Sequence, residues 1–215
     1  MCVCVCVCVC VCVRACEGCC VVLDVAFLVD SSAKTQGQTG WSQLLAFVNR
    51  VVDGLEISQS LVRVAVVTYG DRAQADIRLN QYNDANSLKN RISSLSYMNS
   101  GGNNLASALD TVRTQVFQTN AGARQGAPWV AVVVTDRSPS VRTQDTATAA
   151  GQARAAGIQI IPVGMTGTGQ LTQSILTQIA FINSRVYSST SYSALTASAS
   201  NVAAAVCDSH LSELT

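Results

Sequence analysis

Hydrophobic residues in this chain gather in four nearly uninterrupted runs, and amphipathic segments separate one run from the next. The runs are Val21–Val29, Leu61–Tyr69, Pro128–Asp136 and Ile158–Gly164. Short runs rich in β-branched side chains are typical of strands that are buried on both faces of a parallel sheet. We therefore predict four central strands at these positions.

Two further segments are predicted as strands. Gln74–Asn80 alternates polar and apolar residues, and the short loop Gly70–Arg72 precedes it. Alternation is typical of a half-buried edge strand, and so short a loop joins antiparallel neighbours. The sixth strand is predicted to be short and to lie near Arg185–Ser188.

The segments between the strands have helical periodicity. Apolar residues at the i, i+3, i+4, i+7 spacing predict amphipathic helices. The first helix carries Trp41, Leu44, Leu45, Val48, Val51, Val52 and Leu55, and the others are predicted over Asn83–Leu95, Leu105–Val116, Thr143–Ala156, Leu171–Ile179 and Leu195–Val206. Gly157 would end the alanine-rich fourth helix, because glycine favours the left-handed conformation there. This alternation predicts a doubly wound α/β fold: a mostly parallel six-stranded sheet with one antiparallel edge strand and helices on both faces.

Composition and charge narrow the class of protein. A chain of 215 residues with 48% hydrophobic and 13% charged side chains suits one globular domain. A formal net charge of +1 offers no basic surface for nucleic acid. The one histidine, His210, falls in the polar segment 208–215, which we predict to be a C-terminal tail, so histidine-based catalysis is disfavoured.

Cysteine is concentrated at the start of the chain, where residues 1–18 largely alternate Cys and Val. A TG dinucleotide repeat read in frame would encode this alternation, so the segment is predicted to be an artefact of low complexity, an atypical signal peptide or a cysteine-rich tether. It is too short to span a bilayer. A zinc site is disfavoured, because Cys-x-Cys alternation in an extended chain puts every thiol on one side.

Two cysteines flank the predicted domain, which we place at residues 19–207. Cys20, with Cys19 as the alternative, precedes the first strand, and Cys207 follows the last helix. Since the ends of a domain often lie close together, a disulfide between them is predicted, and it would imply an oxidising compartment. The alternative is a pair of free thiols in a cytosolic protein.

Two carboxylates end neighbouring strands of the predicted sheet. Asp30 ends the first central strand and Asp136 ends the third. Ligands of open α/β sheets bind beyond the carboxyl ends of the strands, and carboxylates with hydroxyls form a site suited to Mg²⁺. Each aspartate alone has another interpretation, as the cap of the turn or helix that follows it.

The segments "DVAFLVDSSAK", "SGGNNLASAL" and "VAVVVTDRS" resemble, in this order, three segments of the von Willebrand factor type A domain. The resemblance extends from Val21 to Cys207. It implies a six-stranded doubly wound sheet whose edge holds a metal-ion-dependent adhesion site, built from an Asp-x-Ser-x-Ser loop, a Thr and an Asp. Extracellular members, such as those in matrilins and collagen VI, often join flanking cysteines, which supports the predicted disulfide.

The adhesion motif is incomplete in this chain. Asp30 and Ser32 match the first loop and Asp136 matches the final Asp, but Lys34 stands at the last Ser and Asn103 at the Thr. An amide oxygen at Asn103 could still coordinate a metal or accept a bond from its water, whereas the ammonium of Lys34 has no acceptor. We predict that Lys34 is a built-in cation that pairs with Asp30 and Asp136, so that Lys34→Ser would create metal binding. The alternative is that Lys34 turns to solvent and a weak Mg²⁺ or Mn²⁺ site remains.

The motifs of other functions are weak. The glycines of Gly164–Gly169 lack the spacing of a phosphate-binding loop, and no Ser-His-Asp set or nucleophile elbow is present. We predict a non-enzymatic, secreted, extracellular module without a cofactor that binds matrix proteins such as collagen. Alternatives are an intracellular assembly or chaperone-type domain, a module with weak Mg²⁺-dependent binding and, least favoured, a nucleotide-binding enzyme.

Overall fold

The structure, a computed structural model, describes residues 21–33, 37–143, 145–167, 171–182 and 185–213. Six strands form one sheet in the order β3-β2-β1-β4-β5-β6, and every pairing is parallel except that of β3 with β2. The strands are β1 (Leu23–Asp30), β2 (Val62–Tyr69), β3 (Ala73–Ile77), β4 (Trp129–Thr135), β5 (Ile158–Met165) and β6 (Tyr187–Ser189). The predicted fold class, with its antiparallel edge strand, is therefore confirmed.

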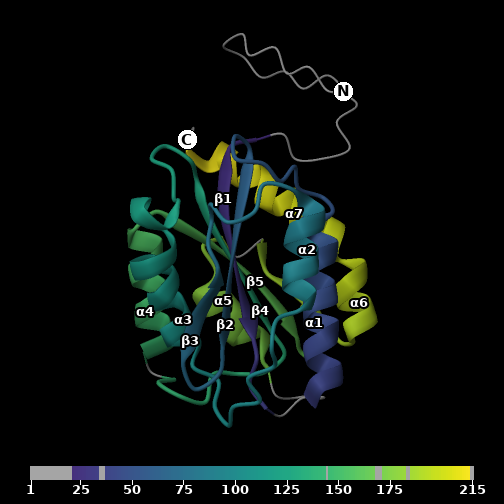
Figure 1. Ribbon diagram of the computed structural model, residues 1–215. Helices are drawn as coiled ribbons and strands as arrows, with labels where there is room; N and C mark the ends of the chain where they lie inside the picture. The colour runs from purple at the N-terminus through teal and green to yellow at the C-terminus, as the bar shows by residue number, and fades with distance from the viewer. Residues whose placement is uncertain (1–20, 34–36, 144, 168–170, 183–184, 214–215) are drawn as a thin grey trace.

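Helices cover both faces of the sheet (Figure 1). The helices α1, α2, α6 and α7 pack on one face, and α3, α4 and α5 pack on the other. Their bounds are α1 (Gly37–Val52), α2 (Ala85–Ser93), α3 (Leu105–Thr111), α4 (Asp145–Ala155), α5 (Gln173–Ile179), α6 (Tyr192–Ala197) and α7 (Ala199–Cys207). The described residues also form a π-helix η1 (Val112–Val116) and the 3-10 helices η2 (Thr119–Ala121) and η4 (Asp208–Glu213).

The central strand β1 explains why the chain forms two hydrophobic cores. All eight of its residues are buried. Side chains alternate between the faces of a strand, so Val25 and Phe27 enter the core under α1 and α7, while Ala26 and Leu28 enter the core under α3 and α4. Burial of one such large apolar side chain contributes about 1.5–3 kcal/mol to folding.

Two of the predicted helices are divided in the structure. The predicted helix Leu105–Val116 is α3 followed by η1, whose wide turn is closed by the bond from Phe117 N to Val112 O at 2.9 Å. The predicted helix Leu195–Val206 is interrupted at Ser198, between α6 and α7. The hydroxyl of Ser198 donates to the Leu195 carbonyl at 2.7 Å, and a serine that bonds to its own turn competes with the helix.

Gly157, two residues after the last residue of α4, has a φ of +82°, and this confirms its predicted role in ending the helix. The sixth strand lies at Tyr187–Ser189, close to its predicted position.

The segment predicted as a polar tail begins packed on the domain. Ser209 in η4 is fully buried, and its carbonyl accepts a hydrogen bond from Gln159 Nε2 at 2.8 Å. Arg185 Nη1 donates to the Ser209 hydroxyl at 2.9 Å. These bonds fix the chain just after α7.

Cys207, the last residue of α7, is disulfide-bonded. Cys19 and Cys20 lie outside the described residues, as does the Cys-Val segment 1–18, so the predicted pairing of Cys207 with Cys20 or Cys19 stays a prediction. Within the described residues, no helix combines the length and the apolar character needed to cross a membrane.

The amino end of the sheet is held by a buried ion pair. Asp24 of β1 is fully buried, and Arg124 donates to its Oδ1 through Nε at 2.9 Å and Nη2 at 2.7 Å. Arg124 Nη2 also donates to the carbonyls of Leu23 and Leu61, at the beginnings of β1 and β2. The start of β1 and the end of α7 both lie at this upper end in Figure 1, so the carboxyl ends of the parallel strands face away from it.

Candidate functional site

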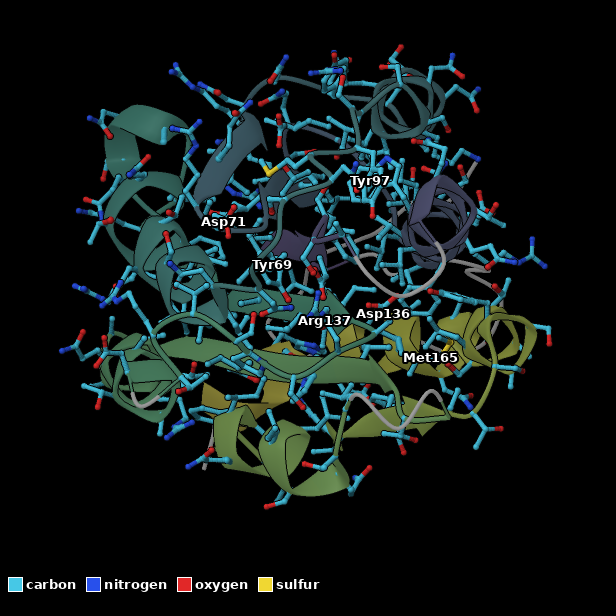
Figure 2. All side chains as sticks on the ribbon, turned by 90° about the horizontal axis from the view of Figure 1, so that it is seen from below. Tyr69, Asp71, Tyr97, Asp136, Arg137 and Met165 are labelled. Carbon is cyan, nitrogen blue, oxygen red and sulfur yellow. The ribbon has the colours of Figure 1, made fainter. Side chains whose placement is uncertain are left out.

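The predicted site residues lie at the lower end of the sheet, where three loops meet. These are residues 30–33 after β1, residues 97–104 before α3 and residues 136–141 after β4. The first and third loops converge because β1 and β4 are neighbouring parallel strands, and the second lies against the end of β2, where Asn104 N donates to the Gly70 carbonyl. Figure 2 looks onto this end and shows Tyr69, Asp136 and Arg137 near its middle, with Asp71 and Met165 on opposite sides.

The loop after β1 is fixed by hydrogen bonds from both neighbours. Tyr97, which stacks on Trp41 at 5.9 Å between ring centroids, donates its hydroxyl to the Ser32 carbonyl at 3.1 Å. The remaining bonds run from Ser31 N to Tyr69 O at 2.7 Å, from Met98 N to Ser31 Oγ at 2.7 Å and from Ala33 N to Ser100 O at 2.5 Å. The first motif loop is thereby held by both backbone and side-chain hydrogen bonds.

Gly70 permits the close approach of the second loop to the end of β2. A Cβ at this position would overlap the side chain of Ser100. The Gly70 carbonyl accepts a bond from Asn104 N at 2.7 Å, and the Asn104 side chain caps α3 by accepting from Ser107 N at 3.0 Å. A glycine at the end of β2 therefore positions the start of α3, next to Asn103.

Asp30 is the centre of the site, and it is surrounded by hydrogen-bond donors. It is 3% exposed, and its Oδ1 accepts from Ser32 N at 3.0 Å and from Ser32 Oγ at 2.6 Å. Its Oδ2 accepts from Asn103 Nδ2 at 2.6 Å, and Thr135 Oγ1 lies 2.8 Å away. The Thr135 hydroxyl also lies 2.9 Å from the Arg137 carbonyl, and its one proton can be donated to only one of the two oxygens. Protein donors thus occupy both oxygens of Asp30.

Asn103 is oriented differently from the sequence-based expectation. Its amide nitrogen faces Asp30, whereas its Oδ1 is buried and has no hydrogen-bond partner among the described residues. From the sequence, the amide oxygen of Asn103 could have been a metal ligand beside Asp30. That orientation is not found, because an ionised carboxylate attracts the amide NH₂ and repels the amide oxygen.

The environment of Asp30 favours its protonated form. Burial raises its pKa to about 6, the charge of Asp136 adds to this rise, and the bonds from Ser32 and Thr135 oppose it. A carboxylate with this pKa is partly protonated just below neutral pH. Because the charge of Asp136 contributes to the raised pKa of Asp30, the two carboxylates interact through space. The sequence predicted that they would be neighbours, from their places at the ends of adjacent strands.

Asp136 is bonded to a residue from the far end of the chain. Tyr192, the first residue of α6, donates its hydroxyl to Asp136 Oδ2 at 2.6 Å. Burial raises the pKa of Tyr192, and the bond to Asp136 adds to the effect, so the phenol remains a donor. This contact ties α6 to the end of β4.

Arg137 brings a buried guanidinium to the loops that follow β1 and β4. The residue is 7% exposed, and Nη1 donates to the Ala33 carbonyl at 3.2 Å. The side chain therefore runs from the loop after β4 to the loop after β1 (Figure 2). Its positive charge also acts on the nearby phenol of Tyr97, where it lowers a pKa that burial raises.

The structure brings together four of the five predicted site residues: Asp30, Ser32, Asn103 and Asp136. Lys34 lies outside the described residues, so its role as a built-in cation stays a prediction. Thr135, Arg137 and Tyr192 also contact the site, and the sequence did not predict them. Thr135 and Arg137 flank Asp136 and could have been found by asking which neighbours share its loop, but no local signal leads to Tyr192.

The described residues do not fit a divalent cation coordinated by Asp30. A cation needs free lone pairs, and the donors of Ser32, Asn103 and Thr135 already face both Asp30 oxygens. The amide nitrogen that Asn103 turns toward Asp30 has no lone pair to offer a cation. The residue types are those of a metal site, but hydrogen-bond donors already occupy the Asp30 oxygens that a cation would need.

The doubly wound sheet with hydroxyls and carboxylates at its edge defines the class of domain. A family model described as "von Willebrand factor type A domain" matches residues 24–201. The chain belongs to this family.

Curated relatives are proteins of the extracellular matrix. Matrilin-3 from Mus musculus is 32% identical over 146 residues, which cover 66% of this chain and 29% of the relative. The collagen alpha-4(VI) chain from Mus musculus is 32% identical over 144 residues, or 66% of this chain and 6% of the relative. The chain thus spans about a third or less of the length of these relatives.

Solved structures share the fold. Proximal thread matrix protein 1 from the mussel byssus is 22% identical and has a TM-score of 0.83, with 89% of this chain and 50% of that chain covered. A second structure of that protein, 21% identical with a TM-score of 0.83 over 89% of this chain and 50% of that chain, is described as having a zinc-occupied MIDAS motif. At this identity the likeness extends to the fold alone.

Proposed function

We propose that this chain is a non-enzymatic adhesion module of the extracellular matrix that binds matrix proteins such as collagens without a metal ion. Family membership supports the adhesion role. The observation that carries the metal independence is the set of protein donors around Asp30, because they take the place that a cation would need. Lys34, at the last position of the motif, would add a positive charge to this edge.

The arrangement of the described chain favours presentation of the lower edge to a partner. The start of β1 and the end of α7 lie together at the upper end, and the three site loops lie at the opposite end (Figure 1). A partner could contact these loops without meeting the segments that enter and leave the domain. The disulfide at Cys207 supports secretion, because disulfides persist in oxidising compartments.

The test is binding of the full chain to immobilised purified collagens, including collagen VI, in EDTA and in millimolar Mg²⁺ or Mn²⁺. We expect equal affinity in both buffers. A thermal melt in the same buffers measures cation binding without a partner: saturation at about 100 times a dissociation constant would stabilise by about 2.7 kcal/mol, which raises the melting temperature by about 5–10 °C. We expect no such rise.

Two results would contradict the proposal in different ways. Binding that is lost in EDTA, together with a raised melting temperature in Mn²⁺, would establish a weak metal-dependent site instead. Absence of binding to every matrix protein tested would remove the adhesion role, and the intracellular assembly function would then become the better candidate.

A further inference from the structure

The hydrogen bond between Asn103 and Asp30 bears directly on whether this edge of the sheet can bind a cation. Nδ2 of Asn103 lies 2.6 Å from Oδ2 of Asp30. Asn103 is fully buried and Asp30 is 3% exposed, so solvent does not compete for this bond. Bonds from a donor to a charged acceptor are about twice as strong as neutral ones.

The amide of Asn103 has one donor end and one acceptor end, and the fold uses only the donor end toward the site. Its Oδ1 lies buried without a hydrogen-bond partner among the described residues, and so does the hydroxyl of Tyr69, which is also fully buried. Burial raises the pKa of the Tyr69 phenol, and the Asn103 side chain opposes this rise. The orientation of the amide is set by the bond from its nitrogen to Asp30.

A hydroxyl at this position would behave differently from the amide. A threonine hydroxyl can donate its proton to Asp30 and still offer a lone pair to a cation. The amide nitrogen of Asn103 donates to Asp30 but has no lone pair to offer. Both groups can donate to Asp30, but replacement of a hydroxyl by this amide nitrogen removes the lone pair that would bind the cation.

We propose that Asn103 is the residue that excludes divalent cations from this edge, through its amide bond to Asp30. This inference rests on the proposed metal-independent function and names the described residue responsible for it. It also changes the expectation for Lys34. Lys34→Ser alone should leave Asp30 bonded to Asn103, so it should not be sufficient to create metal binding.

The experiment measures Mn²⁺ binding to the full chain by isothermal titration and by electron paramagnetic resonance. The variants are Lys34→Ser, Asn103→Thr and the double variant Lys34→Ser/Asn103→Thr. We expect the double variant to bind Mn²⁺ at least about tenfold more tightly than Lys34→Ser, which corresponds to about 1.4 kcal/mol. The matched control is Lys34→Ser/Asn90→Thr, because Asn90 is exposed on α2 and makes none of the hydrogen bonds that Asp30 accepts.

The inference is overturned if Lys34→Ser alone binds Mn²⁺ as tightly as the double variant, or if the double variant folds and binds no better than the control. Circular dichroism and a cooperative melt report whether each variant folds. If Asn103→Thr does not fold, Asn103→Ser is used instead, because serine carries the same hydroxyl on a smaller side chain. Binding of the unmodified chain to collagen in EDTA tests the proposed function separately, so failure of the one can be told from failure of the other.

Discussion

The hydroxyl of Tyr192 lies 2.6 Å from Oδ2 of Asp136, and this bond joins the first residue of α6 to the residue after β4. The two residues are 56 positions apart in the chain. Tyr192 is 6% exposed, so the bond is sheltered from water, and the carboxylate makes it charge-assisted. The edge of the sheet is in this way connected to the C-terminal helices.

Tyr192→Phe should destabilise the domain more than the removal of a tyrosine hydroxyl that has no charged partner. Hydrogen bonds to charged groups contribute about 1.5–3 kcal/mol, so we expect a loss of this size in the free energy of unfolding. Urea unfolding at pH 7.5 measures it. The control is Tyr187→Phe, because the Tyr187 hydroxyl lies at the longer distance of 3.4 Å from the Asn201 carbonyl. Equal losses in the two variants would show that the bond to Asp136 has no special weight.

The raised pKa of Asp30 makes stability depend on pH. The pKa rises from 3.8 to about 6 on folding, chiefly because the carboxyl is buried. The native state therefore holds this proton more tightly than the unfolded state, so the contribution of Asp30 is greatest below about pH 4 and is lost as the pH rises through 6. At about 1.4 kcal/mol for each pKa unit, the loss amounts to about 3 kcal/mol.

Asp30→Asn should remove this pH dependence, because an amide does not titrate. The amide oxygen introduced at position 30 can accept from Ser32. The new amide nitrogen can donate to Asn103 Oδ1 once the Asn103 side-chain amide rotates by half a turn. The measurement is urea unfolding of both proteins from pH 4 to pH 8, compared as a difference so that other carboxylates cancel. We expect the stability of the unmodified chain, relative to the variant, to fall by about 3 kcal/mol across this range. A constant difference would mean that Asp30 titrates normally.

The disulfide of Cys207 should join the two ends of the domain. Peptide mapping without reduction should identify a fragment that links Cys207 to Cys20, or to Cys19 as the alternative. Reduction should lower the free energy of unfolding by about 2–5 kcal/mol, since the bridge restricts the unfolded chain. Cys207→Ser should have the same effect and should no longer respond to reductant. A free Cys207 thiol in protein from an oxidising compartment would contradict the prediction and favour the intracellular alternative.

The sequence by itself determined the fold and the place of the site. Runs rich in β-branched residues, such as Leu61–Tyr69, favour buried strands, and parallel strands bring the residues that follow them to one edge, which is why Asp30 and Asp136 were predicted as neighbours. Flanking helices followed from apolar periodicity. Their interruption at Ser198 did not, because it depends on a local bond that competes with the helix.

Only the tertiary structure decided how the site is bonded. The sequence placed Asn103 beside Asp30, but an amide can present either a donor or an acceptor, and the choice depends on the charge that it faces. In the same way, no local pattern could indicate that Tyr192 reaches Asp136 or that Arg137 reaches Ala33, because these contacts arise from the packing of α6 and the convergence of two loops. The sequence supplies the residue types of the site. The direction of each hydrogen bond and the partners that are distant in sequence depend on how folding buries and packs these side chains.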